Sequence, residues 1–135
     1  MQLQDFSTLF DLLPIGAYRS TPEGKILRVN AALLRINGYA TEAECFADDK
    51  EIARDSYVDP HRRARFKAIL ETQGHISDFV SETYRLKTGE RIWVREHAHL
   101  VRDEDGKVLY YEGTIEDISR ERAATLALQK SEDLL

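Results

Sequence analysis

Glu96 is the residue whose chemistry fits least with its neighbours along the chain. It lies in a β-rich run, in which successive side chains point to opposite faces. The face that Glu96 shares is otherwise apolar, and its other members are Ile92, Val94, Ala98 and Leu100. A buried acid needs a partner or a raised pKa. We therefore expect Glu96 to pair with a core arginine or to cap a loop, with contact to a bound ligand as the alternative.

Two histidines on the same run, His97 and His99, are two residues apart and point the same way. Such a pair is able to hold a metal ion, with His75 or an acid as the third ligand. No third ligand stands at a clear spacing, and a pattern of two ligands is nonspecific. We therefore expect these histidines on a polar face opposite Glu96, and no metal site.

The elements that must position these residues are three long β-rich runs in the second half of the chain. They span residues 76–86, 91–102 and 108–118, and the polar loops between them contain Gly89 and Gly106. Short glycine-containing loops of this kind are typical of antiparallel hairpins. The second half therefore predicts a three-stranded antiparallel sheet.

The first half predicts a shorter hairpin and several short helices. Strands are expected at 15–20 and 25–30, around a turn that contains Pro22 and Gly24. Apolar spacing and capping residues predict helices at 5–13, at 31–37 after the N-cap Asn30, after the N-cap Thr41, from Asp59-Pro60 to Gly74, and at 120–135 after the N-cap Ser119. The basic run from His61 to Lys67 is expected to be a solvated helix face, with an anion or partner patch as the alternative.

This order predicts an α+β domain. The two groups of strands form one five-stranded antiparallel sheet, and the middle helices cover one of its faces. An N-terminal helix and a C-terminal helix flank the sheet. The length of 135 residues suits a single domain.

Composition excludes several other classes of protein. A single cysteine, Cys45, excludes a disulfide framework and a cysteine-rich zinc site, and indicates a reducing compartment, the cytoplasm. No apolar run is long enough to span a membrane, so we expect no membrane contact. The net charge of −5 disfavours nucleic-acid binding.

Seven short motifs stand in a characteristic order along the chain. They are Leu13-Pro14-Ile15-Gly16, Pro22-Glu23-Gly24-Lys25-Ile26, Val29-Asn30-Ala31-Ala32, Tyr84-Arg85-Leu86-Lys87-Thr88-Gly89-Glu90, Trp93-Val94, Arg102-Asp103-Glu104-Asp105-Gly106 and Gly113-Thr114-Ile115-Glu116-Asp117-Ile118-Ser119-Arg120-Glu121-Arg122. With the element order, they resemble the PAS domain, the sensory module of bacterial signalling proteins. The last motif is similar to the Asp-Ile-Thr motif with which that domain ends, with Ser119 in the threonine place.

The resemblance implies a ligand cup on one face of the sheet. The ligand-binding positions that it implies are Tyr84, Val94, Glu96, Ala98, Tyr111 and Gly113. A glycine in mid-strand, such as Gly113, often marks the close approach of a ligand or of another backbone segment. Asp117 and Ser119 would relay the state of the sheet to the C-terminal helix.

The resemblance also implies the domain boundaries of the chain and its binding partners. Residues 1–14 would form an N-terminal flanking helix, 15–118 the sensory domain and 119–135 an exit helix that leads to a further domain. The expected partners are a second copy, bound through the flanking helices, and an output histidine kinase or cyclase domain. No catalysis is expected of this segment itself.

Neither of two cofactors familiar in PAS relatives finds its motif here. Flavin-photoadduct relatives carry a reactive cysteine in an Asn-Cys-Arg-Phe-Leu-Gln type motif, whereas Cys45 stands in Glu44-Cys45-Phe46. Haem-binding relatives need an inward histidine on the long helix, and His61 falls outside the apolar stripe of that helix. The sequence therefore argues against both groups and leaves the ligand unknown.

Two alternatives of other classes are kept. The first is a dimerisation or protein–protein interaction module with no ligand, its cup packed by Tyr84, Tyr111 and Trp93. The second is a small metal-dependent α+β enzyme that uses Glu96 with the two histidines. The enzyme ranks last because no nucleophile–base pair and no phosphate-binding glycine loop stand at a recognisable spacing.

Overall fold

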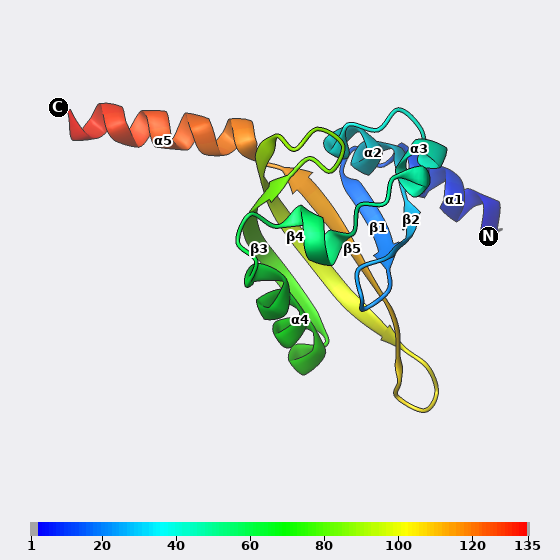
Figure 1. The fold of residues 1–135 in the computed structure, drawn as a ribbon. Coiled ribbons are helices and arrows are strands. Elements are labelled where there is room, and N and C mark those ends of the chain that lie inside the picture. The colour runs from blue at the N-terminus through cyan, green and yellow to red at the C-terminus, as the bar shows by residue number, and fades with distance from the viewer. Residues whose placement is uncertain (1–2, 135) are drawn as a thin grey trace.

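The sheet at the centre of the molecule has five antiparallel strands in the order β2-β1-β5-β4-β3 (Figure 1). The computed structural model describes residues 3–134, and the ends of the predicted segments 1–14 and 119–135 lie outside this range. The strands are β1 (Gly16–Ser20), β2 (Ile26–Val29), β3 (His75–Tyr84), β4 (Arg91–Arg102) and β5 (Val108–Asp117). The predicted α+β class and the five-stranded sheet are confirmed.

The helices between β2 and β3 cover one face of this sheet, as predicted, and the N-terminal and C-terminal helices flank it. The elements are α1 (Leu3–Leu12), α2 (Ala31–Asn37), α3 (Glu42–Ala47), a π-helical turn η1 (Ile52–Ser56), α4 (Arg62–Gln73) and α5 (Ser119–Asp133). Figure 1 shows α5 leaving the sheet on the side away from α1, so the described chain ends point in different directions.

Local capping explains why the short helices form where they do. The Asn30 side chain accepts a hydrogen bond from Leu33 N, 3.0 Å away, as the predicted N-cap of α2. Asn30 is fully buried, and it also accepts from Ala17 N and donates to Phe10 O and Ile15 O. One side chain thereby joins α1, β1 and α2. Thr41 caps α3 in the predicted way, accepting from Glu44 N.

The start of α4 differs from the prediction by two residues. Asp59 does not cap the helix, because its carboxylate accepts from His61 N and closes a separate turn. The helix itself begins at Arg62, after His61 in the cap position. The C-terminal end is as predicted, with Gly74 in the left-handed conformation at φ 84°.

Two buried clusters hold the helices to the sheet. The first, between the β1–β2 hairpin and α2, contains Tyr18, Val29, Leu33, Tyr39, Cys45 and Leu86. The second, between α4 and strands β3–β5, contains Phe66, Leu70, Ile76, Phe79, Ala98 and Tyr111. In the second cluster the rings of Phe66 and Tyr111 meet edge to face, 6.2 Å apart.

Candidate functional site

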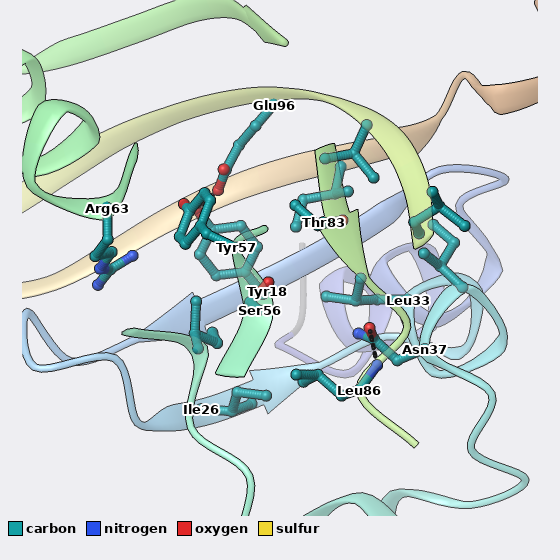
Figure 2. Close-up of a pocket in the computed structure, with 15 residues that line it drawn as sticks. Tyr18, Ile26, Leu33, Asn37, Ser56, Tyr57, Arg63, Thr83, Leu86 and Glu96 are labelled. Atoms are coloured by element: carbon teal, nitrogen blue, oxygen red, sulfur yellow. Dashed lines mark hydrogen bonds between the residues drawn. The ribbon is translucent and has the colours of Figure 1, made fainter. Parts of the chain in front are cut away.

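A cavity of about 50 Å³ lies between the inner face of the sheet and the helices, beside the first cluster (Figure 2). Its apolar lining is Ile26, Leu33, Ile36, Ile52, Leu86, Ile92, Val94 and Ile115. Its polar lining is Tyr18, Asn37, Ser56, Tyr57, Arg63, Thr83 and Glu96. Figure 2 shows Arg63, Tyr57, Tyr18 and Glu96 toward one end, with Leu33 and Leu86 toward the other. The ionisable side chains therefore gather at one end of the cavity, whereas the other end is apolar apart from Asn37, whose side-chain oxygen accepts from Leu86 N.

Glu96 is buried in the polar end of this cavity, 6% exposed. The Tyr18 hydroxyl donates a hydrogen bond to its Oε2 atom. Burial raises the pKa of Glu96 from its usual value to about 7, although the hydrogen bond from Tyr18 and the charge of Arg63 both act to lower it. Glu96 thus changes charge near neutral pH, and its hydrogen-bond partner is a tyrosine and not the core arginine or the loop expected from the sequence.

Arg63 is the buried cation at the same end of the cavity, 7% exposed. Its Nη2 atom donates to Pro22 O at 3.3 Å, and its guanidinium lies 5.3 Å from the Phe66 ring centroid and 5.8 Å from that of Tyr111. Its Nε atom has no hydrogen-bond partner among the described residues. Arg63 is therefore not a solvated residue, contrary to the expectation for the basic run.

The spacing along α4 contains a signal for Arg63. It stands three residues before Phe66 and seven before Leu70, the stripe that faces the sheet. The positive charges on either side hide this periodicity. Tyr57 was also missed, because it lies in an irregular segment and reaches the sheet only through a bridge to Thr83. Burial and nearby Glu96 raise the pKa of Tyr57, and the charge of Arg63 counteracts them.

Gly113 is a glycine because two groups approach its Cα closely. A Cβ atom there would lie 2.5 Å from His97 O and 2.8 Å from the Tyr18 hydroxyl. Tyr18 pairs with Gly113 across β1 and β5, so its ring crosses the bare backbone to reach Glu96 on β4. The close approach predicted from this mid-strand glycine is that of another strand and a tyrosine side chain.

The structure separates the predicted ligand-binding residues into three groups. Val94 and Glu96 line the cavity. Ala98 and Tyr111 face the same side of the sheet but lie in the second cluster, and the Tyr111 hydroxyl donates to Glu71. Gly113 supports Tyr18 without lining the cavity.

Tyr84 does not lie on the cavity face, which corrects the prediction. The ladder between β3 and β4 shifts register between Ile76 and Phe79, and Asp78 in the shifted stretch has φ 53°. Past this bulge the odd residues, such as Thr83, face inward. Tyr84 consequently lies on the other face, where its ring contacts Arg91.

The junction between the sheet and α5 is built from Asp117 and Ser119. The carboxylate of Asp117 accepts from Ser119 N at 2.9 Å, and the Ser119 hydroxyl accepts from Trp93 N at 2.9 Å. Ser119 is therefore the first residue of α5 and not its cap, and the cap position is held by Ile118. Both predicted relay residues connect α5 to β4 and β5.

Arg85 joins this junction to the cavity wall. Its Nη2 atom donates to Asp117 at 3.3 Å, and its Nη1 atom donates to Ile36 O at 2.7 Å. Ile36 lines the cavity and lies in the last turn of α2. A single guanidinium therefore contacts both the helix that covers the cavity and the residue that holds the start of α5.

The other residues considered for chemistry lie outside the cavity. His97 and His99 are on the opposite face, near Asp78 and Glu112 respectively. Among residues 3–134, no group of three His, Cys, Asp or Glu side chains is placed to hold a metal ion. Cys45 is buried in the first cluster and does not line the cavity.

A family model described as PAS domain matches residues 15–120 of this fold. The chain belongs to the PAS domain family. PAS domains are sensory modules and not enzymes, so the predicted sensory class follows from membership. No described helix of this PAS domain has the length and apolar character needed to cross a membrane.

Relatives of this PAS domain occur in signalling proteins. A blue-light-activated histidine kinase of Rhizobium johnstonii is 29% identical over 114 residues, which cover 84% of this chain and 32% of the kinase. The chain thus spans about a third of that relative. An RNA-binding light-oxygen-voltage receptor shares the fold with a TM-score of 0.74 at 19% identity, covering 98% of this chain and 38% of the receptor.

A further light-oxygen-voltage domain, studied with a flavin analogue, matches 98% of each chain at 20% identity with a TM-score of 0.65. These relatives raise the question of whether a flavin fits this PAS domain. The cavity of about 50 Å³ is well below the roughly 300–1,000 Å³ of sites for drug-sized ligands. Its lining contains no cysteine for a covalent adduct. In this conformation the cavity does not fit a flavin, and the prediction against a photoadduct stays a prediction.

Proposed function

We propose that this PAS domain, residues 15–118, is a sensor that binds a small ligand in the cavity beside Glu96. Residues 1–14 and 119–135 are then the flanking segments, and α5 carries the signal onward. The observation that supports this best is the cavity itself, with an apolar wall and, at one end, a buried acid and a buried arginine that form no ion pair. A buried polar pair at the edge of an apolar space is typical of a ligand site.

The relay that we propose runs from the cavity to α5 through Asp117 and Ser119, with Arg85 as the bridge from α2. A ligand that favours one position of α2 shifts the population of α5 positions, because Arg85 contacts both Ile36 O and Asp117. The output domain that we infer is a histidine kinase or a cyclase, in the cytoplasm. The kinase is supported by the relative from Rhizobium johnstonii.

Two measurements test the sensor. Native mass spectrometry with an absorbance spectrum of freshly purified protein shows whether a ligand co-purifies, and a flavin or haem would give a coloured species. Hydrogen exchange then tests the relay with Val94→Ile, which adds one methylene to the cavity wall. We expect altered exchange in the first turn of α5 for Val94→Ile and not for Val101→Ile, its control away from the cavity lining. Unchanged exchange in Val94→Ile would refute the relay.

An interaction module without a ligand is the second candidate, and the exposed face of α5 favours it. No side chain of this helix is buried within the described chain, and Leu126, Leu128 and Leu134 are 53%, 63% and 80% exposed. These three leucines are spread around α5, but Leu128 lies in one row with Ala124 and Ser131 at 4-3 spacing, which suits a short homodimer seam through the flanking helices. Light scattering tests this with Leu128→Glu against Leu109→Glu, an exposed leucine of β5. A dimer that only Leu128→Glu disrupts would support the proposal.

A further inference from the structure

Arg63 carries a charge into the cavity that no protein acid neutralises. None of the ion pairs among the described residues includes Arg63, and its Nε atom has no hydrogen-bond partner there. Glu96 acts on Arg63 only through the electrostatic field between them, and Glu96 itself is partly protonated near neutral pH. A buried charge is costly unless it is paired, and although Pro22 O and the Tyr57 hydroxyl contact this guanidinium, no carboxylate of the described residues pairs with the edge that carries the unbonded Nε atom.

The chemistry of that edge specifies the missing acceptor. A guanidinium offers parallel N–H groups whose spacing matches the two oxygens of a carboxylate. Figure 2 shows Tyr57 beside Arg63, and the Tyr57 hydroxyl is in hydrogen-bond contact with the guanidinium, so a bound carboxylate would share Arg63 with this hydroxyl. Farther along, Leu33, Ile36 and Leu86 offer apolar surface, and the neighbouring Asn37 carries no charge and accepts from Leu86 N, so this end suits methylene groups and not a second charge.

The size of the cavity limits the length of the ligand. About 50 Å³ is more than one water molecule requires, and far less than a drug-sized ligand occupies. Resting on the sensory function proposed above, we infer that the ligand is a short-chain carboxylate, with its carboxylate held by Arg63 and its alkyl chain directed toward Leu33 and Leu86.

Glu96 gives this binding a proton dependence. The titratable groups that face Glu96 are Tyr18 from β1, Tyr57 from the segment after η1, and Arg63 from α4. Its register neighbours on β3 and β5 are Phe79 and Ile115, which carry no charge. A second anion beside Glu96 disfavours its ionised form, so binding takes up a proton. The affinity for a carboxylate therefore falls about tenfold per pH unit above the pKa of Glu96.

Calorimetric or NMR titration with acetate, propionate and butyrate tests the inference, with butyramide as the uncharged control of equal length. We expect butyrate to bind at least tenfold more tightly than butyramide, and more tightly at pH 6 than at pH 8. Arg63→Gln removes the guanidinium, and Arg65→Gln makes the same charge change on the exposed side of α4. Only Arg63→Gln should lose butyrate affinity, by tenfold or more.

The possible failures separate this inference from the proposed sensor. Equal binding of butyrate and butyramide, or full butyrate affinity in Arg63→Gln, would overturn the carboxylate assignment and leave a ligand cavity in place. Absence of binding by every probe would also overturn the carboxylate assignment. The relay is tested separately, by hydrogen exchange of Val94→Ile in the absence of any ligand. If Arg63→Gln does not fold, Arg63→Lys takes its place, because lysine keeps the charge and lacks the parallel N–H groups of the guanidinium. The comparison of butyrate with butyramide in the unaltered protein then still tests the carboxylate assignment.

Discussion

Burying Glu96 makes the stability of this domain depend on pH in a direction opposite to that of most acids. The pKa of Glu96 is raised by burial to about 7 in the folded protein, whereas an unfolded glutamate titrates near its ordinary value. The folded state therefore holds the proton more tightly. The contribution of Glu96 to the free energy of unfolding is fully present below the pKa that Glu96 has in the unfolded chain. This contribution is lost as the pH rises through the pKa that Glu96 has in the folded protein.

The magnitude follows from the two pKa values. The shift from 4.5 to about 7 corresponds to roughly 3 kcal/mol over the whole titration, of which about 2.5 kcal/mol falls between about pH 5 and about pH 8. Glu96→Gln keeps an oxygen that accepts from the Tyr18 hydroxyl and removes the titration. The free energy of unfolding of the native protein, minus that of Glu96→Gln, should therefore fall by that amount across this interval.

Urea unfolding at a series of pH values measures this difference, with the fluorescence of the single tryptophan, Trp93, and far-UV circular dichroism as probes. Glu104→Gln is the matched control, because Glu104 is an exposed carboxylate in the turn between β4 and β5. The difference for the control should change little with pH. A Glu96 difference that is constant from pH 5 to pH 8 would refute the argument, as would one that rises with pH.

Three further predictions concern contacts described above. Gly113→Ala should lower the free energy of unfolding by about 2–4 kcal/mol, since the new methyl group meets His97 O and the Tyr18 hydroxyl; urea unfolding measures it, and an unchanged midpoint would contradict it. Asp117→Asn and Ser119→Ala should each speed hydrogen exchange in the first turn of α5 and cost about 1 kcal/mol; exchange equal to that of the unaltered protein would count against the junction. Arg122→Ala should shift Trp93 emission to the red, because the guanidinium lies 3.8 Å from the indole ring, and cost about 0.5–1 kcal/mol; an identical spectrum would show the contact is absent in solution.

Periodicity was enough to predict the inward row of β4. Val94 and Glu96 line the cavity as an alternation of two requires, and the histidines lie on the opposite face. The hairpin loops and the Asn30 and Thr41 caps follow from local chemistry, which short-range sequence signals report well. These features depend on residues close together in the chain.

The remaining errors come from tertiary effects that no local signal reports. The bulge at Asp78 reverses the alternation of β3, which moves Tyr84 to the outer face and Thr83 to the cavity. Arg63 is buried although charged, because Phe66 of α4 and Tyr111 of β5 lie near its guanidinium and Glu96 of β4 lies at the same end of the cavity. Tyr57 reaches the cavity only because the irregular segment before α4 is held against β3.

The strand order also has a consequence for how the chain acquires its structure during synthesis. β5, the last strand to leave the ribosome, pairs with both β1 and β4 and so occupies the middle of the sheet. The N-terminal hairpin must therefore wait for about a hundred residues before its main partner exists, a long-range closure of the kind that slows folding. The cavity cannot close before that strand docks, and Asp117 is its final residue. A nascent chain thus completes its binding site and the attachment point of its exit helix in the same step.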